Sequence, residues 1–140
     1  ICGEFCVITA TADEKLNAYI YKLCHERNVL VNSVDDKDKC DFIFSSTIQK
    51  GNLSIGVSSG GTSPVVTTLL KQDIEKIIPD NIENILIFLE NVRCDAKLKI
   101  HDNILRNQYL TEIAKACYTQ NRVLNDTEIE KFLIKYNNSY

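Results

Sequence analysis

A strand, a helix and a second strand follow one another with short links near the start of the chain, and this order restricts the fold most. Residues 5–10 are a short run of apolar and β-branched residues between polar ones, which is typical of a buried strand. Asp13 can cap a helix whose apolar side chains repeat every three or four residues as far as Arg27. Residues 29–34 then predict a second strand. Because such a unit joins parallel strands, we expect an α/β protein.

The predicted sheet changes character after an acidic stretch at residues 35–39. Residues 41–48 and 53–58 predict two further strands, and the Lys-Gly-Asn sequence at 50–52 is typical of a turn. Two strands joined by so short a turn form an antiparallel hairpin. We therefore expect a boundary near Asp41, between a Rossmann-like half and a second unit.

The rest of the chain predicts helices. Ser63 and Pro64 suit the N-cap and the first position of an amphipathic helix that Pro79 ends. The helical period then continues to the end of the chain. Thr127, with Glu130 three residues later, predicts a capping box at the start of the last helix.

Charge and composition argue against several classes of partner. The 140 residues have a formal net charge of -3 and no run rich in Lys and Arg, so we expect no nucleic acid partner. No apolar run approaches the roughly 20 residues of a membrane span, and we expect a cytoplasmic protein. The six cysteines show no zinc-ligand spacing, so we interpret them as reduced thiols and expect no bound metal. We interpret His25 and His101 as surface or capping residues rather than ligands.

Two segments contain residue types that bind or transform ligands. Asp35 and Asp36 follow the second predicted strand, at the carboxyl end where open α/β sheets bind their ligands. On spacing alone a solvated acidic loop, in which Asp36 or Asp38 caps a turn, is the favoured interpretation. Residues 58–64, SSGGTSP, lead into a helix N-terminus, where amides and hydroxyls can bind an anion. The same residues also suit a simple strand-to-helix turn.

Taken together, these segments resemble the precorrin-2 dehydrogenase and sirohydrochlorin ferrochelatase family, which forms the N-terminal region of siroheme synthases. The resemblance depends on the order and spacing of residues 9–13 with Asn17, 32–36 (NSVDD), 40–44 (CDFIF), 53–57 and 58–65 (SSGGTSPV). It implies a partial Rossmann-like parallel sheet followed by a β-hairpin and a helical dimerisation region. Residues 1–40 would be the C-terminal part of an NAD-binding domain, residues 41–80 a hairpin and helix for dimerisation and substrate binding, and residues 81–140 a helical C-terminal region.

The resemblance also implies an activity, the NAD-dependent oxidation of precorrin-2 to sirohydrochlorin, to which some members add ferrous iron insertion. Asp35 aligns with the family's catalytic aspartate, and a carboxylate can accept the proton that this oxidation releases. Asp36 beside it is expected to raise the pKa of Asp35 by like-charge repulsion. The tetrapyrrole substrate has many carboxylates, and the residues expected to bind it are Asn32, Ser59, Gly60, Gly61, Thr62 and Ser63.

Family members hold the cofactor pyrophosphate with a GxGxxA turn, and the 140 residues contain no such motif. The expected cofactor contacts are therefore Thr11, Ala12 and Asp13, at the end of the first predicted strand. The expected protein partner is a second copy of the chain. A competing hypothesis is a non-enzymatic dimerising module whose 58–64 turn binds phosphate or another anion, but it leaves the acidic pair and the hairpin unexplained.

Overall fold

The computed structural model describes residues 3–34 and 36–137 and divides the chain into two compact units. One unit comprises residues 1–46 and 56–71, and the other comprises residues 47–55 and 72–140. The two units are described in turn.

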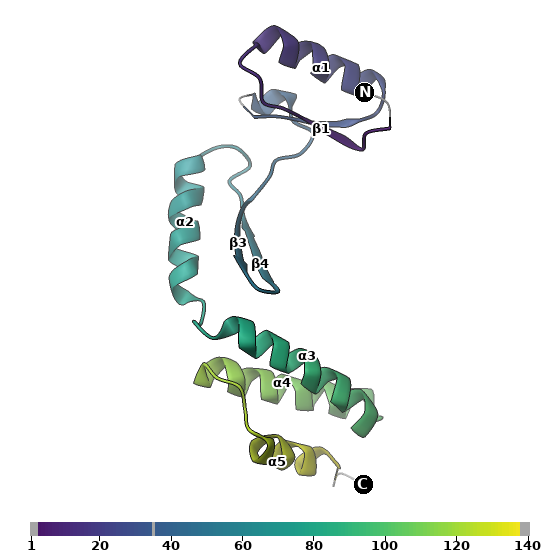
Figure 1. Ribbon diagram of the computed structural model, residues 1–140, viewed down its shortest axis with the longest axis vertical. Helices are drawn as coiled ribbons and strands as arrows, with labels where there is room; N and C mark the ends of the chain where they lie inside the picture. Colours follow the sequence, from purple (N-terminus) through teal and green to yellow (C-terminus); the bar gives the residue numbers. More distant parts are fainter. Residues whose placement is uncertain (1–2, 35, 138–140) are drawn as a thin grey trace. The chain divides into compact units, whose positions relative to one another are not determined.

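The first unit contains the predicted strand–helix–strand motif, with β1 (Cys6–Thr9), α1 (Glu14–Glu26) and β2 (Leu30–Ser33) in that order (Figure 1). The two strands are parallel, and Thr9 lies opposite Ser33. The Asp13 carboxylate caps α1, as predicted, by accepting hydrogen bonds from the first-turn amides. The expected α/β class and parallel pair are therefore confirmed.

The segment after β2 folds back along the free edge of that strand and closes it with side chains. The Asp41 amide donates to the Val31 carbonyl at 2.8 Å, and the Val31 amide donates to Asp41 Oδ2, also at 2.8 Å. Two residues further along β2, the Ser33 amide donates to Cys40 Sγ at 3.2 Å. Because Val31 is fully buried, its amide has no access to water and depends on the Asp41 carboxylate.

The hairpin forms where it was predicted, but its first strand is shorter. β3 (Ser46–Lys50) and β4 (Leu53–Val57) are joined by a turn at residues 51–52 (Figure 1). The prediction of a strand from residue 41 is wrong for residues 41–45, because Asp41 bonds to β2 before the hairpin begins.

The second unit is mainly helical. α2 (Pro64–Ile77) begins in the first unit and ends in the second, and α3 (Ile82–Lys99), α4 (Asn103–Gln120) and α5 (Asp126–Asn137) follow. α3 packs on α4, and α4 packs on α5 (Figure 1). The core between these helices consists of Ile85, Val92, Ala96, Ile100, Tyr109, Ile113, Cys117, Leu124 and Tyr136. Within the described ranges no helix is both long and apolar enough to span a bilayer. The division into regions 1–40, 41–80 and 81–140 stays a prediction.

The last helix begins with a capping box, two residues before the predicted position. Asn125 Oδ1 accepts from the Glu128 amide at 3.0 Å, and the Asn125 amide donates to Glu128 Oε2 at 2.9 Å. The Arg122 guanidinium also holds the Glu128 carboxylate, through two hydrogen bonds of 2.9 and 2.7 Å. The prediction of a box at Thr127 and Glu130 is therefore wrong, because Arg122 favours the carboxylate at 128.

Asp41→Ala is expected to lower the free energy of unfolding by about 1–3 kcal/mol, because it removes the acceptor of a buried amide. Asp41→Asn, which keeps an oxygen at this position, is expected to lose less stability. Asp38→Ala, in the exposed 3-10 helix η1 (Lys37–Lys39), serves as the control. Urea unfolding measures all three variants. If Asp41→Ala and Asp38→Ala lose equal stability, the closure of the β2 edge does not depend on this carboxylate.

The Arg122 and Asn125 hydrogen bonds lower the pKa of Glu128 from 4.5 to about 2. A carboxyl with a depressed pKa in the folded state stabilises the fold above its unfolded value and loses that contribution as the pH falls. The melting temperature of the helical unit should therefore fall between pH 4.5 and about 2. Glu128→Gln should show a smaller fall over this window, while the control Glu130→Gln should follow the wild type. Parallel curves for Glu128→Gln and wild type would contradict this assignment.

Candidate functional site

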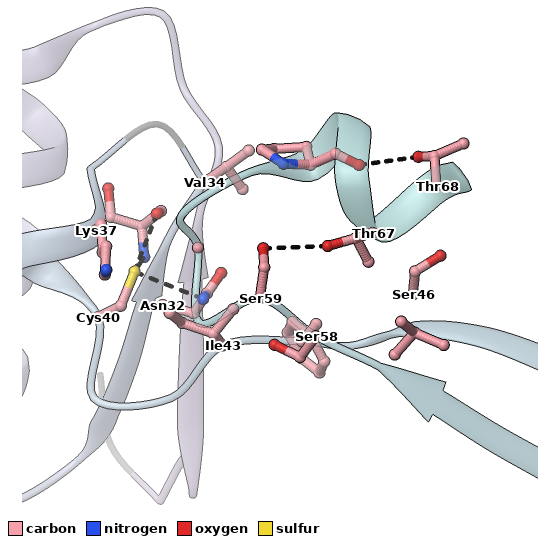
Figure 2. Close-up of a pocket in the computed structure, with 15 residues that line it drawn as sticks. Asn32, Val34, Lys37, Cys40, Ile43, Ser46, Ser58, Ser59, Thr67 and Thr68 are labelled. Carbon is pink, nitrogen blue, oxygen red and sulfur yellow. Dashed lines mark hydrogen bonds between the residues drawn. The ribbon is translucent and has the colours of Figure 1, made fainter. Parts of the chain in front are cut away.

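A cavity of about 420 Å³ lies at the carboxyl end of β2 in the first unit (Figure 2). Its walls come from three segments, namely residues 32–34, residues 37–46 and residues 57–68. Three of the residues predicted to bind substrate line it: Asn32, Ser59 and Gly61. Gly60, Thr62 and Ser63 belong to the same turn but do not line this cavity.

Asn32 forms part of the cavity wall and is fixed by the segment that closes β2. Its Nδ2 donates to the Phe42 carbonyl at 2.7 Å and lies 3.6 Å from Cys40 Sγ. The side chain amide is therefore oriented before any ligand binds.

The 58–64 turn is organised around the hydroxyl of Ser59. This hydroxyl accepts from the Ser63 amide at 3.0 Å. It also accepts from the Thr67 hydroxyl at 3.1 Å (Figure 2). The Gly60 amide donates to Ser58 Oγ at 3.2 Å. Several amides and hydroxyls that were expected to face a ligand therefore also hold the turn together.

Other groups of the turn remain available to an anion. The amides of Gly61 and Val65 have no hydrogen-bond partner among the described residues. They lie at or before the first turn of α2, where the helix dipole is positive. Lys37 also lines the cavity and brings a cationic side chain to it (Figure 2). Amides, a helix N-terminus and a lysine together suit a ligand with carboxylates.

Sequence reasoning missed two kinds of site residue. Thr67 is 8% exposed, and its hydroxyl connects Ser59 to the Ser63 carbonyl. Its spacing of four residues after the N-cap was the available signal. Lys37 and Cys40 gave no such signal, because they reach the cavity only through the folding of the 36–41 segment.

A second, smaller cavity of about 270 Å³ lies at the carboxyl ends of β1 and β2. It is lined by Thr11, Ala12, Glu14, Asn17, Ser33, Asp36 and Lys39, so it includes two of the residues predicted to contact the cofactor. The third, Asp13, caps α1 instead of lining the cavity. The volume is below the roughly 300–1,000 Å³ of pockets for drug-sized ligands, so these residues fit one part of a dinucleotide rather than the whole.

The walls of the smaller cavity are polar and well ordered. Asn17 holds the Thr11 loop, since its Nδ2 donates to the Thr11 carbonyl at 2.9 Å and its Oδ1 accepts from the Thr11 hydroxyl at 2.6 Å. These hydroxyls and amides are the donor and acceptor types that a ribose or a carboxamide requires.

The acidic turn after β2 is described on both sides of Asp35, which itself lies outside the described residues. Before it, the Val34 amide donates to the Thr9 carbonyl at 3.0 Å. After it, the Asp36 amide donates to the Ser33 carbonyl at 3.3 Å. The hydrogen bond from the Lys39 ammonium lowers the pKa of Asp36, so this carboxyl is ionised at neutral pH.

Two adjacent glycines of the turn provide a matched pair for a stability test. Gly60 and Gly61 have φ values of +60° and +75°, which cost an L-residue roughly 1–2 kcal/mol. A Cβ at Gly61 would also lie 3.2 Å from the side chains of Ile43 and Lys37, whereas a Cβ at Gly60 would meet nothing within 4 Å. Gly61→Ala should therefore lower the free energy of unfolding more than Gly60→Ala does. Equal losses in denaturant titrations would mean that these neighbours move without cost.

Comparison with known proteins gives matches to two family models, in the order expected from the resemblance. Residues 1–46 match the model described as "Putative NAD(P)-binding". Residues 50–77 match the model described as "Sirohaem biosynthesis protein central".

Curated relatives and a solved structure agree with these models. The siroheme synthase of Buchnera aphidicola is 40% identical over 121 residues, which are 86% of this chain and 25% of the relative. Siroheme synthase 1 of Pectobacterium atrosepticum is 35% identical over 109 residues, which are 78% of this chain and 23% of the relative. The chain thus spans about a quarter of the length of these relatives.

The fold is similar to that of SirC, a precorrin-2 dehydrogenase. The TM-score is 0.74 at 22% identity, over 95% of this chain and 63% of that one. This likeness confirms the fold of a partial parallel sheet, a hairpin and following helices. Both family models are matched in order, and the siroheme synthases align across most of this chain, so the chain is homologous to a part of the siroheme synthases.

Proposed function

We propose that this chain acts in siroheme biosynthesis as the active-site part of a cytoplasmic, NAD-dependent precorrin-2 dehydrogenase. One observation carries the proposal: a single cavity is lined both by the residues that lead into the acidic pair and by the 58–64 turn. These segments are far apart in the sequence. Oxidation of a tetrapyrrole with many carboxylates requires a proton acceptor and groups that bind carboxylates, and we propose Asp35 and the 58–64 turn for these two roles.

Asp35 is the proposed general base. Oxidation of precorrin-2 removes a hydride and a proton, and a carboxylate next to the reacting carbon can accept the proton. The Val34 side chain lines the large cavity, which supports a role at this cavity for the residue that follows it. NAD, when bound, supplies the hydride acceptor, and Thr11 and Ala12 in the smaller cavity are the residues proposed to hold part of it.

The substrate carboxylates are proposed to bind at the 58–64 turn. Ser59 and Thr67 fix the turn, while the Gly61 amide and the Lys37 ammonium provide the contacts that favour an anion. Gly60, Thr62 and Ser63 contribute by shaping the turn, and Asn32 contributes from β2. A purely anion-binding module has weaker support, because it gives no role to the acidic pair that follows β2.

We extend the proposal to two further properties of the family. Ferrous iron is a proposed second substrate, with Asp35 accepting pyrrole protons as the metal enters. A homodimer is proposed through α2, whose side chains Val65, Val66, Leu69 and Leu70 are between 49% and 69% exposed. Four exposed apolar side chains on one helix are typical of an interaction surface.

Replacement of Asp35 tests the proposed base. Asp35→Asn in the intact protein should lower kcat for NADH formation from precorrin-2 by roughly 10²–10⁴-fold, because general base catalysis contributes about this much. Precorrin-2 binding, followed by its absorbance, should stay near the wild-type value. Asp38→Asn, in the same acidic stretch, is the matched control and should keep full activity.

Two outcomes would contradict the proposal at different points. A normal rate for Asp35→Asn would remove Asp35 from the mechanism. A wild-type protein that binds precorrin-2 but forms no NADH would remove the dehydrogenase activity itself.

A further inference from the structure

We propose that Cys40 is a positioning residue, which uses its thiol to hold the acidic turn at the end of β2. The inference deepens the proposed function and rests on it, because the position of this turn matters to catalysis only if Asp35 is the base. Cys40 does not touch the reacting atoms in this proposal and acts through the turn.

The thiol contacts the chain on both sides of the turn. Cys40 Sγ accepts a hydrogen bond from the Ser33 amide at 3.2 Å, and it lies 3.1 Å from the Ser33 carbonyl. On the other side it lies 3.2 Å from the Asp36 carbonyl. The thiol hydrogen can therefore be donated to either carbonyl, while the sulfur accepts from the amide. A single side chain thus bridges Ser33, the last residue of β2, and Asp36, the second member of the acidic pair.

Cys40 has an anchor that does not depend on the turn. The next residue, Asp41, is bound to Val31 through its amide and its carboxylate, each at 2.8 Å. The other carboxylate oxygen of Asp41 lies 3.1 Å from His25 Nε2 on α1. Because Asp41 is fixed to β2 and α1, the position of Cys40 is set by the core of the unit. The thiol therefore holds the turn at a fixed place relative to the core of the unit.

A second contact reinforces the same geometry. The Lys39 ammonium pairs with the Asp36 carboxylate. The next residue, Cys40, contacts the Asp36 carbonyl, so Asp36 is held through both its side chain and its backbone. Cys40 also lines the large cavity, next to Asn32 (Figure 2). A thiol here is half-buried and already engaged, unlike an exposed cysteine such as Cys94 on α3.

The test compares Cys40→Ala, Cys40→Ser and the control Cys94→Ala in the intact protein. Hydrogen exchange of the Ser33 and Asp36 amides reports on the turn itself, and it should be about tenfold faster in Cys40→Ala, as expected for the loss of one hydrogen bond. Steady-state oxidation of precorrin-2 should show kcat about 10- to 100-fold lower, because small displacements of a catalytic group have effects of this size. KM should stay within about twofold, since the carboxylate-binding turn is unchanged.

Cys40→Ser should recover most of kcat, because a hydroxyl can also accept from the amide and donate to a carbonyl. The pH dependence of kcat should shift in Cys40→Ala and return toward that of the wild type in Cys40→Ser. Cys94→Ala should match the wild type in exchange, kcat and pH dependence.

The outcomes separate this inference from the proposed function. If the wild type is active and Cys40→Ala keeps its kcat and pH dependence, the positioning role is overturned even when the amides exchange faster. If the wild type forms no NADH from precorrin-2, the dehydrogenase proposal fails, and the catalytic role of Cys40 fails with it.

Discussion

The architecture of the site depends on how the free edge of β2 is closed. β2 pairs with β1 along one edge, and along the other the Asp41 backbone and carboxylate bind Val31. A buried strand edge without partners is costly, and a carboxylate that accepts from a buried amide removes this cost with one residue instead of a further strand. The chain is then free to leave the sheet at once and enter the hairpin. The departing segment then forms one of the three walls of the large cavity.

At the 58–64 turn, side-chain hydroxyls accept hydrogen bonds from backbone amides, as the Asp41 carboxylate does at β2. The Ser59 hydroxyl receives both the Ser63 amide and the Thr67 hydroxyl, so the first turn of α2 is joined to the loop before it. Such local side-chain bonds compete with regular structure elsewhere, but at a helix start they stabilise it. The two positive φ values at Gly60 and Gly61 bring the chain into this arrangement. Rigidity of the turn therefore comes from small polar residues rather than from apolar packing.

Features that depend on local periodicity could be predicted from the sequence. The parallel unit followed from the apolar repeat of α1 and its Asp13 cap, and the start of α2 followed from Ser63 and Pro64. Where two local sequence signals were equivalent, the sequence could not predict which of them the structure uses. Asn125 and Thr127 each have a glutamate three residues later, and the Arg122 guanidinium binds the first of these two, Glu128.

The two units of the chain are not continuous in sequence. The chain changes unit after residues 46, 55 and 71, so each unit is built from separate stretches of the polypeptide. A domain that is continuous in sequence can be exchanged between genes by recombination at its two ends. Units built from interleaved stretches cannot be exchanged one at a time in this way. Any recombination point placed between residues 47 and 71 separates parts of both units. The site and the helical region are therefore expected to be inherited together, as a single block of sequence.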